Sequence, residues 1–88
     1  MNEVILFLQN NPRINIEIDG HTDSLGNDAY NLRLSLDRAK SVGTFLKDAG
    51  ISVQRVKEVG YASKKPLKPN NSDQNRLFNR RIEFKIMN

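Results

Sequence analysis

The sequence predicts an α/β domain of the α+β two-layer sandwich type, with helices packed on one face of a small mixed sheet. Two segments carry apolar residues at helical spacing, and two others alternate apolar with polar residues. Helical and extended segments follow one another in the order helix, strand, helix, strand, strand, which favours helices layered on a sheet. A chain of 88 residues has room for a single domain, 1–88.

The first two elements are a helix and a strand. Residues 3–10 carry apolar side chains at helical spacing, and Pro12 prevents the helix from continuing. Between residues 14 and 19 isoleucine alternates with polar residues, which predicts a half-buried strand that closes at Gly20.

The third element is the longest helix, over about residues 28–49. Asn27 or Asp28 is suited to cap its first N–H groups, and Gly50 stands where a left-handed C-cap is needed. Its apolar residues fall close to one stripe, which is expected to face the core: Tyr30, Leu34, Val42, Phe45, Leu46 and Ala49.

The rest of the chain predicts two strands separated by a long loop. A short strand is expected around residues 56–59, followed by a loop over 62–75 that is rich in Pro and Asn. In the last strand Ile82, Phe84 and Ile86 are expected to face inward, with Arg81, Glu83 and Lys85 outward. The aromatic residues are expected in the core: Tyr30, Phe45, Phe78 and Phe84.

Composition narrows the function classes. There is no cysteine, which excludes disulfides and thiolate metal sites. The single histidine, His21, excludes a histidine-cluster metal site and is expected to have a structural role, hydrogen-bonded to nearby backbone. The other metal-binding side chains are scattered carboxylates, so no metal or cofactor is expected. The longest apolar run, residues 4–8, is too short to cross a bilayer.

Two oppositely charged residues form the candidate binding site. Asp23 follows the end of the first strand, where side chains commonly meet ligands, and Arg38 lies on the long helix. If both face one pocket, Asp23 can accept an ammonium and Arg38 can bind a carboxylate through two hydrogen bonds. Such a pair suits a zwitterionic ligand. The spacing leaves open that the two residues pair with each other or do not meet.

An ordered set of motifs runs along the chain: Gly20-His21-Thr22-Asp23, Tyr30-Asn31, Leu34-Ser35, Arg38-Ala39, Gly60-Tyr61-Ala62 and Asn79-Arg80-Arg81-Ile82-Glu83. This set resembles the C-terminal domain family of OmpA, which includes the peptidoglycan-associated lipoproteins and the flagellar motor protein B. The resemblance covers about residues 14–86. One departure is Asn75, which stands before Arg76 where the family usually has glycine. A second is the abundance of lysine in the loop 62–75.

The resemblance implies a β-α-β-α-β-β fold whose first strand is absent from this chain, so that the domain is truncated at its N-terminus. It implies non-covalent binding of peptidoglycan through the meso-diaminopimelate of the stem peptide. This binding would anchor the parent protein or the outer membrane to the cell wall, in the periplasm.

The resemblance also implies roles for individual residues. Asp23 would hold the ammonium of diaminopimelate, and Arg38 its carboxylate. Asn31 and backbone groups near Thr22 would contact the peptide. Arg80 or Arg81 would flank the site, and the alternation of side chains along a strand leaves open which one faces it.

Two other function classes are weaker. A wall-hydrolysing enzyme would need a nucleophile beside a general base, and the chain has one histidine, no cysteine and no G-x-S-x-G motif. A nucleic-acid-binding domain would suit the net charge of +4 and the basic C-terminal part, but basic residues interleaved with aromatics are missing. The chain is therefore predicted not to be an enzyme or a nucleic-acid binder. A homodimer is left open.

Overall fold

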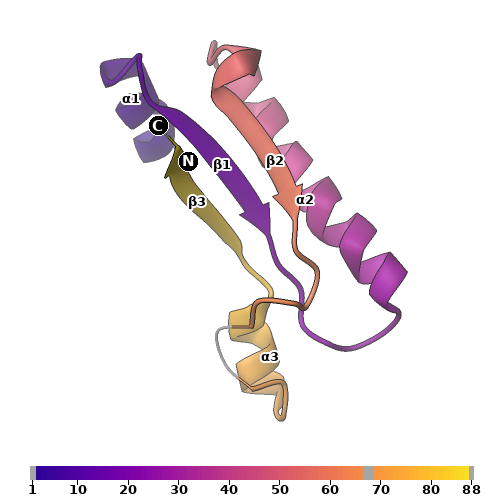
Figure 1. Ribbon diagram of the computed structural model, residues 1–88. Helices are drawn as coiled ribbons and strands as arrows, with labels where there is room; N and C mark the ends of the chain where they lie inside the picture. The colour runs from indigo at the N-terminus through magenta and orange to yellow at the C-terminus, as the bar shows by residue number, and fades with distance from the viewer. Residues whose placement is uncertain (1, 67–68, 88) are drawn as a thin grey trace.

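The structure, a computed structural model, describes residues 2–66 and 69–87. Two helices lie behind a three-stranded sheet, and a third, short helix lies beyond its end (Figure 1). In chain order the elements are α1 (Asn2–Asn10), β1 (Asn15–Gly20), α2 (Asp28–Asp48), the 3-10 turn η1 (Val53–Arg55), β2 (Val56–Gly60), α3 (Asp73–Asn79) and β3 (Ile82–Met87). The predicted two-layer fold with a small mixed sheet is confirmed.

β1 is the central strand of the sheet, between a parallel β2 and an antiparallel β3. Ile18 lies opposite Glu58 on one side and Phe84 on the other. This position corrects the prediction of a half-buried strand, because β1 is buried on both faces, including Glu17 and Asp19 at 6% exposure each. Side chains from both neighbouring strands cover the polar face of a central strand, whereas an edge strand has neighbours on one side.

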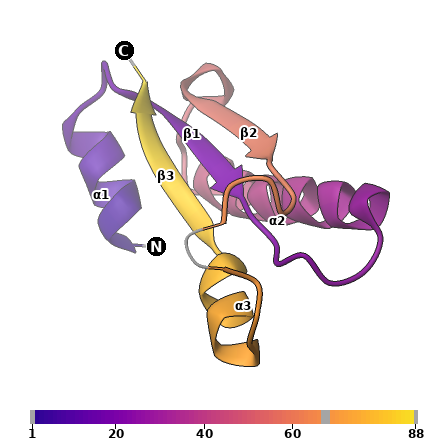
Figure 2. The same ribbon diagram turned by 60° about the horizontal axis from the view of Figure 1, so that its bottom comes forward.

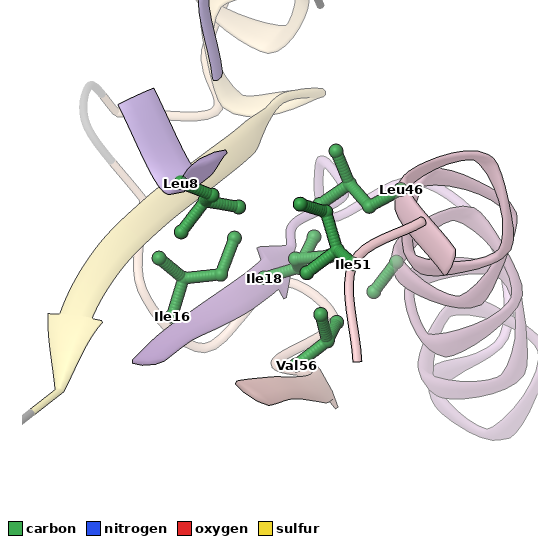
Figure 3. Packing of buried hydrophobic residues seen from close by; sticks show 7 residues of the cluster. Leu8, Ile16, Ile18, Leu46, Ile51 and Val56 are labelled. Carbon is green, nitrogen blue, oxygen red and sulfur yellow. The ribbon is translucent and has the colours of Figure 1, made fainter. Parts of the chain in front are cut away.

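The core is aliphatic and lies between β1 and the two long helices. Figure 3 shows Leu8 from α1 and Leu46 from α2 directed toward Ile16 and Ile18 of β1. Ile51, which follows α2, Val56 at the start of β2 and Ala39 of α2 complete this cluster.

Close packing between α2 and the sheet overturns most of the predicted helix stripe, of which Leu46 is buried and Val42 packs against the core. The buried face of α2 consists mainly of small or polar residues at a spacing of three or four: Asn31, Ser35, Ala39, Gly43 and Leu46. A Cβ atom added to Gly20 would stand 1.9 Å from the backbone oxygen of Ser35, so β1 and α2 are nearly in backbone contact. No aromatic ring fits in such an interface.

The aromatic residues predicted to lie in the core are exposed instead. Tyr30 and Phe45, on α2, are 63% and 49% exposed, because the helix turns its small residues toward the sheet. Phe78 and Phe84 are 48% and 41% exposed. Phe84 and Ile86 pair with Ile18 and Ile16 of β1, so they lie on the core side of the sheet as predicted, but β3 is an edge strand of the described sheet and leaves both side chains exposed.

Helix α3 begins inside the segment 62–75 that was predicted to be a loop. Ser72 is its N-cap, and the Ser72 Oγ accepts a hydrogen bond of 3.1 Å from the Asn75 N–H. The sequence carries this cap but no apolar stripe behind it, so periodicity could not reveal the helix. The caps of α2 are as predicted, with Asn27 at its start and Gly50, at φ 101°, after its end.

Buried acids lie side by side on the polar face of β1. Burial and the hydrogen bond with Glu17 raise the pKa of Asp19 to about 6, and the same hydrogen bond lowers the pKa of Glu17. Glu17 also accepts a hydrogen bond of 3.2 Å from the Tyr61 hydroxyl and lies 3.9 Å from the Lys57 ammonium. Below about pH 6, Glu17 therefore holds the charge of the pair and Asp19 holds the proton.

We expect Asp19→Asn to stabilise the protein at pH 8 and to lose this advantage toward pH 4. The pKa of Asp19 is raised on folding, so its contribution to stability is fully present below pH 3.8 and is lost as the pH rises through about 6. The free energy of unfolding of the variant, relative to wild type, should be higher at pH 8 than at pH 4 by about 2–3 kcal/mol. Urea denaturation at both pH values measures this change. Asp37→Asn, on the exposed face of α2, is the control, and an equal difference for both variants would contradict the assignment.

Candidate functional site

Residues 21–27 connect the C-terminal end of β1 to α2 (Figure 2). The candidate site is a cleft lined in part by this segment. It has a volume of about 240 Å³. Eight residues line it: Thr22, Asp23, Leu25, Tyr30, Asn31, Leu34, Arg38 and Arg80. The structure therefore brings together every predicted ligand-binding residue except Arg81.

Asp23 supplies a buried negative charge at the cleft. Only 5% of the residue is exposed. One carboxylate oxygen, Oδ1, accepts a hydrogen bond of 2.9 Å from the Leu25 N–H, and the other, Oδ2, forms an ion pair with Nε of Arg80. Burial alone would raise the pKa of Asp23, but the contacts with Arg80 and Leu25 hold it below its ordinary value. Asp23 is therefore ionised at neutral pH.

Arg38 supplies an exposed positive charge on the α2 side of the same cleft. Among residues 2–66 and 69–87 it forms no ion pair and no hydrogen bond through its side chain. The direct pair between Asp23 and Arg38 that the sequence left open is not formed, because Arg80 occupies Asp23. The Arg38 guanidinium keeps its donors for another partner.

Thr22 and Asn31 brace the loop that carries Asp23. The Asn31 amide donates hydrogen bonds to the backbone oxygens of Leu25, at 2.9 Å, and Asp23, at 3.5 Å. The Thr22 hydroxyl donates to the Asp23 backbone oxygen at 3.0 Å, and the Thr22 N–H donates to Ala62 at 2.8 Å. Both residues line the cleft although both are buried, so their contact with a ligand stays a prediction.

The two neighbouring arginines point to different places. Arg80 lines the cleft, whereas Arg81 is held elsewhere by Glu83, at 2.5 Å, and by the backbone oxygen of Lys65, at 2.8 Å. Arg81 therefore does not line the cleft that holds Asp23. Sequence periodicity could not distinguish the two, because the strand that orders them, β3, begins only at Ile82.

Sequence reasoning missed the apolar wall of the cleft. Leu25, Tyr30 and Leu34 line it, and Leu25 and Tyr30 are 53% and 63% exposed. Helical spacing assigned Tyr30 and Leu34 to the core. The sequence did indicate which face of α2 packs on the sheet, because the smaller residues on the opposite side of the helix mark the face that can approach a sheet closely.

A second cluster of polar side chains lies on the face of the sheet away from α1 and α2, and it consists of Asp19, His21 and Glu83. Each offers one ligand atom, and these atoms lie within 4.8 Å of one another, so the cluster could hold a metal ion. The acids that are scattered in the sequence converge here because Asp19 and Glu83 are paired across β1 and β3.

The structure also corrects the expectation that the His21 side chain is hydrogen-bonded to nearby backbone. The His21 ring stacks on Tyr61 with centroids 5.3 Å apart, and neither ring nitrogen has a hydrogen-bond partner among the described residues. Only its backbone is hydrogen-bonded, to Arg81. Burial, and the positive charge of Arg81, lower the pKa of His21. The hydrogen bond from Arg81 lowers the pKa of Glu83.

Comparison with known proteins gives consistent matches over nearly the whole chain. The chain is 40% identical to outer membrane porin F of Pseudomonas fluorescens over 80 residues, which are 91% of this chain and 24% of the porin. It is 38% identical to the peptidoglycan-associated lipoprotein of Buchnera aphidicola over 81 residues, 92% of this chain and 47% of the lipoprotein. The chain thus spans about a quarter of the one relative and about half of the other.

A solved structure has the same fold. The peptidoglycan-associated lipoprotein of Burkholderia pseudomallei superposes with a TM-score of 0.92 at 27% identity, over 97% of this chain and 72% of that one. No helix in the described ranges has the length and hydrophobicity to span a membrane. The model of the OmpA family matches residues 1–80. The chain belongs to the OmpA family.

Proposed function

We propose that this chain is a non-catalytic domain that binds peptidoglycan through the meso-diaminopimelate of the stem peptide. It would thereby anchor its parent protein, or the outer membrane, to the cell wall in the periplasm. The observation that carries this proposal is the convergence of a buried carboxylate, Asp23, and an unpaired guanidinium, Arg38, on one cleft. Relatives named as peptidoglycan-associated lipoproteins support it.

The cleft matches the chemistry of the diaminopimelate head. This group carries an ammonium and a carboxylate on the same carbon, so a protein that recognises both needs an acid and a base close together. Asp23 would accept the ammonium, and Arg38 would bind the carboxylate through two parallel hydrogen bonds. Leu25, Tyr30 and Leu34 would pack against the methylene groups that lead to the head.

Arg80 acts as an internal competitor for the ligand's ammonium. It occupies Asp23 Oδ2, so an ammonium that binds this oxygen has to replace it. The Arg80 side chain is 43% exposed and can turn toward the ligand carboxylate once it leaves Asp23. The exchange of one cation for another limits the net gain, and we expect affinities in the micromolar to millimolar range for one stem peptide. The polymeric wall compensates by presenting many copies.

The alternatives fit the site less well. His21, the residue best suited to acid–base catalysis, does not line the cleft. A hydrolase would need such a base beside Asp23 and Arg38. A buried carboxylate at the cleft repels phosphate groups, which disfavours nucleic acid as the ligand.

We expect Asp23→Ala and Arg38→Ala each to abolish detectable heat when a diaminopimelate tripeptide is titrated into the protein. Wild type should bind a lysine tripeptide about ten- to a hundredfold more weakly, because that ligand lacks the carboxylate for Arg38. The controls are Asp37→Ala and Arg33→Ala, exposed residues of α2 that do not line the cleft. Circular dichroism should show an intact fold in all variants. Equal affinity for the two tripeptides would remove Arg38 from its role.

Arg80→Gln should reduce the discrimination between the two tripeptides. Without Arg80 the ammonium of either ligand meets an unoccupied Asp23, but the diaminopimelate carboxylate loses its second arginine. The affinity ratio of the two tripeptides should fall about threefold to tenfold, as for one hydrogen bond to a charged group that is partly screened by solvent. Arg81→Gln, outside the cleft, serves as the matched control and should leave the ratio unchanged. An unchanged ratio in Arg80→Gln would show that Arg80 does not reach the ligand.

A further inference from the structure

Buried side-chain atoms without hydrogen-bond partners are concentrated at one place on the sheet. Of four such atoms in the described residues, three belong to Asp19 and His21: Oδ1 of Asp19, and Nδ1 and Nε2 of His21. The two residues are only 6% and 2% exposed. Folded proteins seldom bury polar atoms without partners, and a bound ion is one of the few explanations for such a group.

The strands hold these residues in a ligating arrangement. Asp19 and His21 are two positions apart along the same chain segment and project from the same face of the sheet. Glu83 lies directly opposite Asp19 on β3, and its Oε1 is 3.7 Å from Nε2 of His21. Arg81 holds the other Glu83 oxygen, Oε2, at 2.5 Å, which leaves Oε1 for another partner.

We propose that Asp19, His21 and Glu83 form a binding site for a divalent transition-metal cation, with Zn²⁺ the best fit. Zinc binds imidazole nitrogen and carboxylate oxygen at about 2.0–2.2 Å, which places its ligand atoms about 3.4 Å apart in a tetrahedron. The 3.7 Å between His21 and Glu83 is close to this spacing. Three protein ligands leave a position for water. Glu83, whose side chain is 43% exposed, gives the ion a route from solvent.

The surrounding charges decide which cations can bind. Glu17 adds a third acid to Asp19 and Glu83, but Lys57, Lys65, Lys85 and Arg81 surround the same face and offset them. A site without an excess of negative charge does not hold hard cations by electrostatic attraction alone. Mg²⁺ and Ca²⁺, which prefer oxygen ligands only, are therefore excluded, and a cation that bonds to imidazole is selected.

A bound ion would join the central strand to β3 and would give a partner to Oδ1 of Asp19 and to one ring nitrogen of His21. Its expected effect is a rise in thermal stability, since a ligand that binds only the folded state stabilises it. This role is independent of the cleft around Asp23, because Asp19, His21 and Glu83 do not line it. Binding of diaminopimelate peptides should therefore be the same with and without zinc.

Titration calorimetry of the tag-free, chelator-treated protein with ZnCl2 and with MgCl2 tests the site. We expect one zinc ion per chain, no magnesium binding and a higher melting temperature with zinc. Glu83→Gln should weaken zinc binding at least tenfold, and His21→Gln should abolish it. Asp37→Asn is the matched control for the loss of one carboxylate on an exposed surface.

A measurement on the wild type tests the site even if the variants fail to fold. Zinc should shift the ring ¹⁵N resonance of the coordinating nitrogen of His21, the one histidine of the chain. No zinc-dependent change in this resonance, or equal zinc affinity of Glu83→Gln and Asp37→Asn, would overturn the proposal.

Discussion

The central strand β1 has to bury two chemically opposite faces. Ile16 and Ile18 pack into the aliphatic core, while Glu17 and Asp19 lie on the other face and are as inaccessible as the isoleucines. The first face requires close contact with helices. The second requires that charge be neutralised, by a proton on Asp19 below about pH 6 and by the lysines of the neighbouring strands above it. The position of the strand in the middle of the sheet imposes both requirements.

Close contact between β1 and α2 also positions the cleft. Because the helix turns its small residues toward Gly20 and Gly60, its larger side chains point away from the sheet. Among these, Tyr30, Leu34 and Arg38 lie beside the loop that follows β1. The same packing that excludes aromatic rings from the core therefore supplies the cleft with its apolar wall and its free guanidinium.

Much of the fold was predictable because its signals are local. The caps at Asn27 and Gly50 and the alternation in β1 depend on near neighbours in the chain. The convergence of Asp23 with Arg38 followed from strand and helix positions together with the family resemblance. Contacts between residues that are distant in the sequence could not be predicted from such local signals.

Two of those contacts matter most. The pair of Arg80 with Asp23 joins residues 57 positions apart, and the meeting of Glu83 with His21 depends on strand register. The predicted helix stripe was wrong at Tyr30 and Phe45 for a related reason. Hydrophobicity alone does not indicate how closely two backbones approach. The large apolar residues of α2 were therefore predicted to face the core, and its small residues were not.

The C-terminal end of helix α1 is held by a side chain from a distant part of the chain, in addition to the packing of Val4, Ile5 and Leu8 in the core. The Arg55 guanidinium donates hydrogen bonds to the backbone oxygens of Leu8, Asn11 and Ile14, at 2.8–3.0 Å. These contacts tie the end of α1 and the start of β1 to the turn before β2. Both ends of the central strand are thus fastened, one by Arg55 and the other by the loop around Asp23.

The pairing of β1 on both edges has a mechanical consequence. Its hydrogen bonds to β2 and β3 run across the strand direction, in registers that extend from Ile16 to Gly20 on one side and from Asn15 to Gly20 on the other. A pull on a ligand held at Asp23, directed along the strand, would load both rows of bonds in shear. All the bonds would then resist together instead of parting one after another.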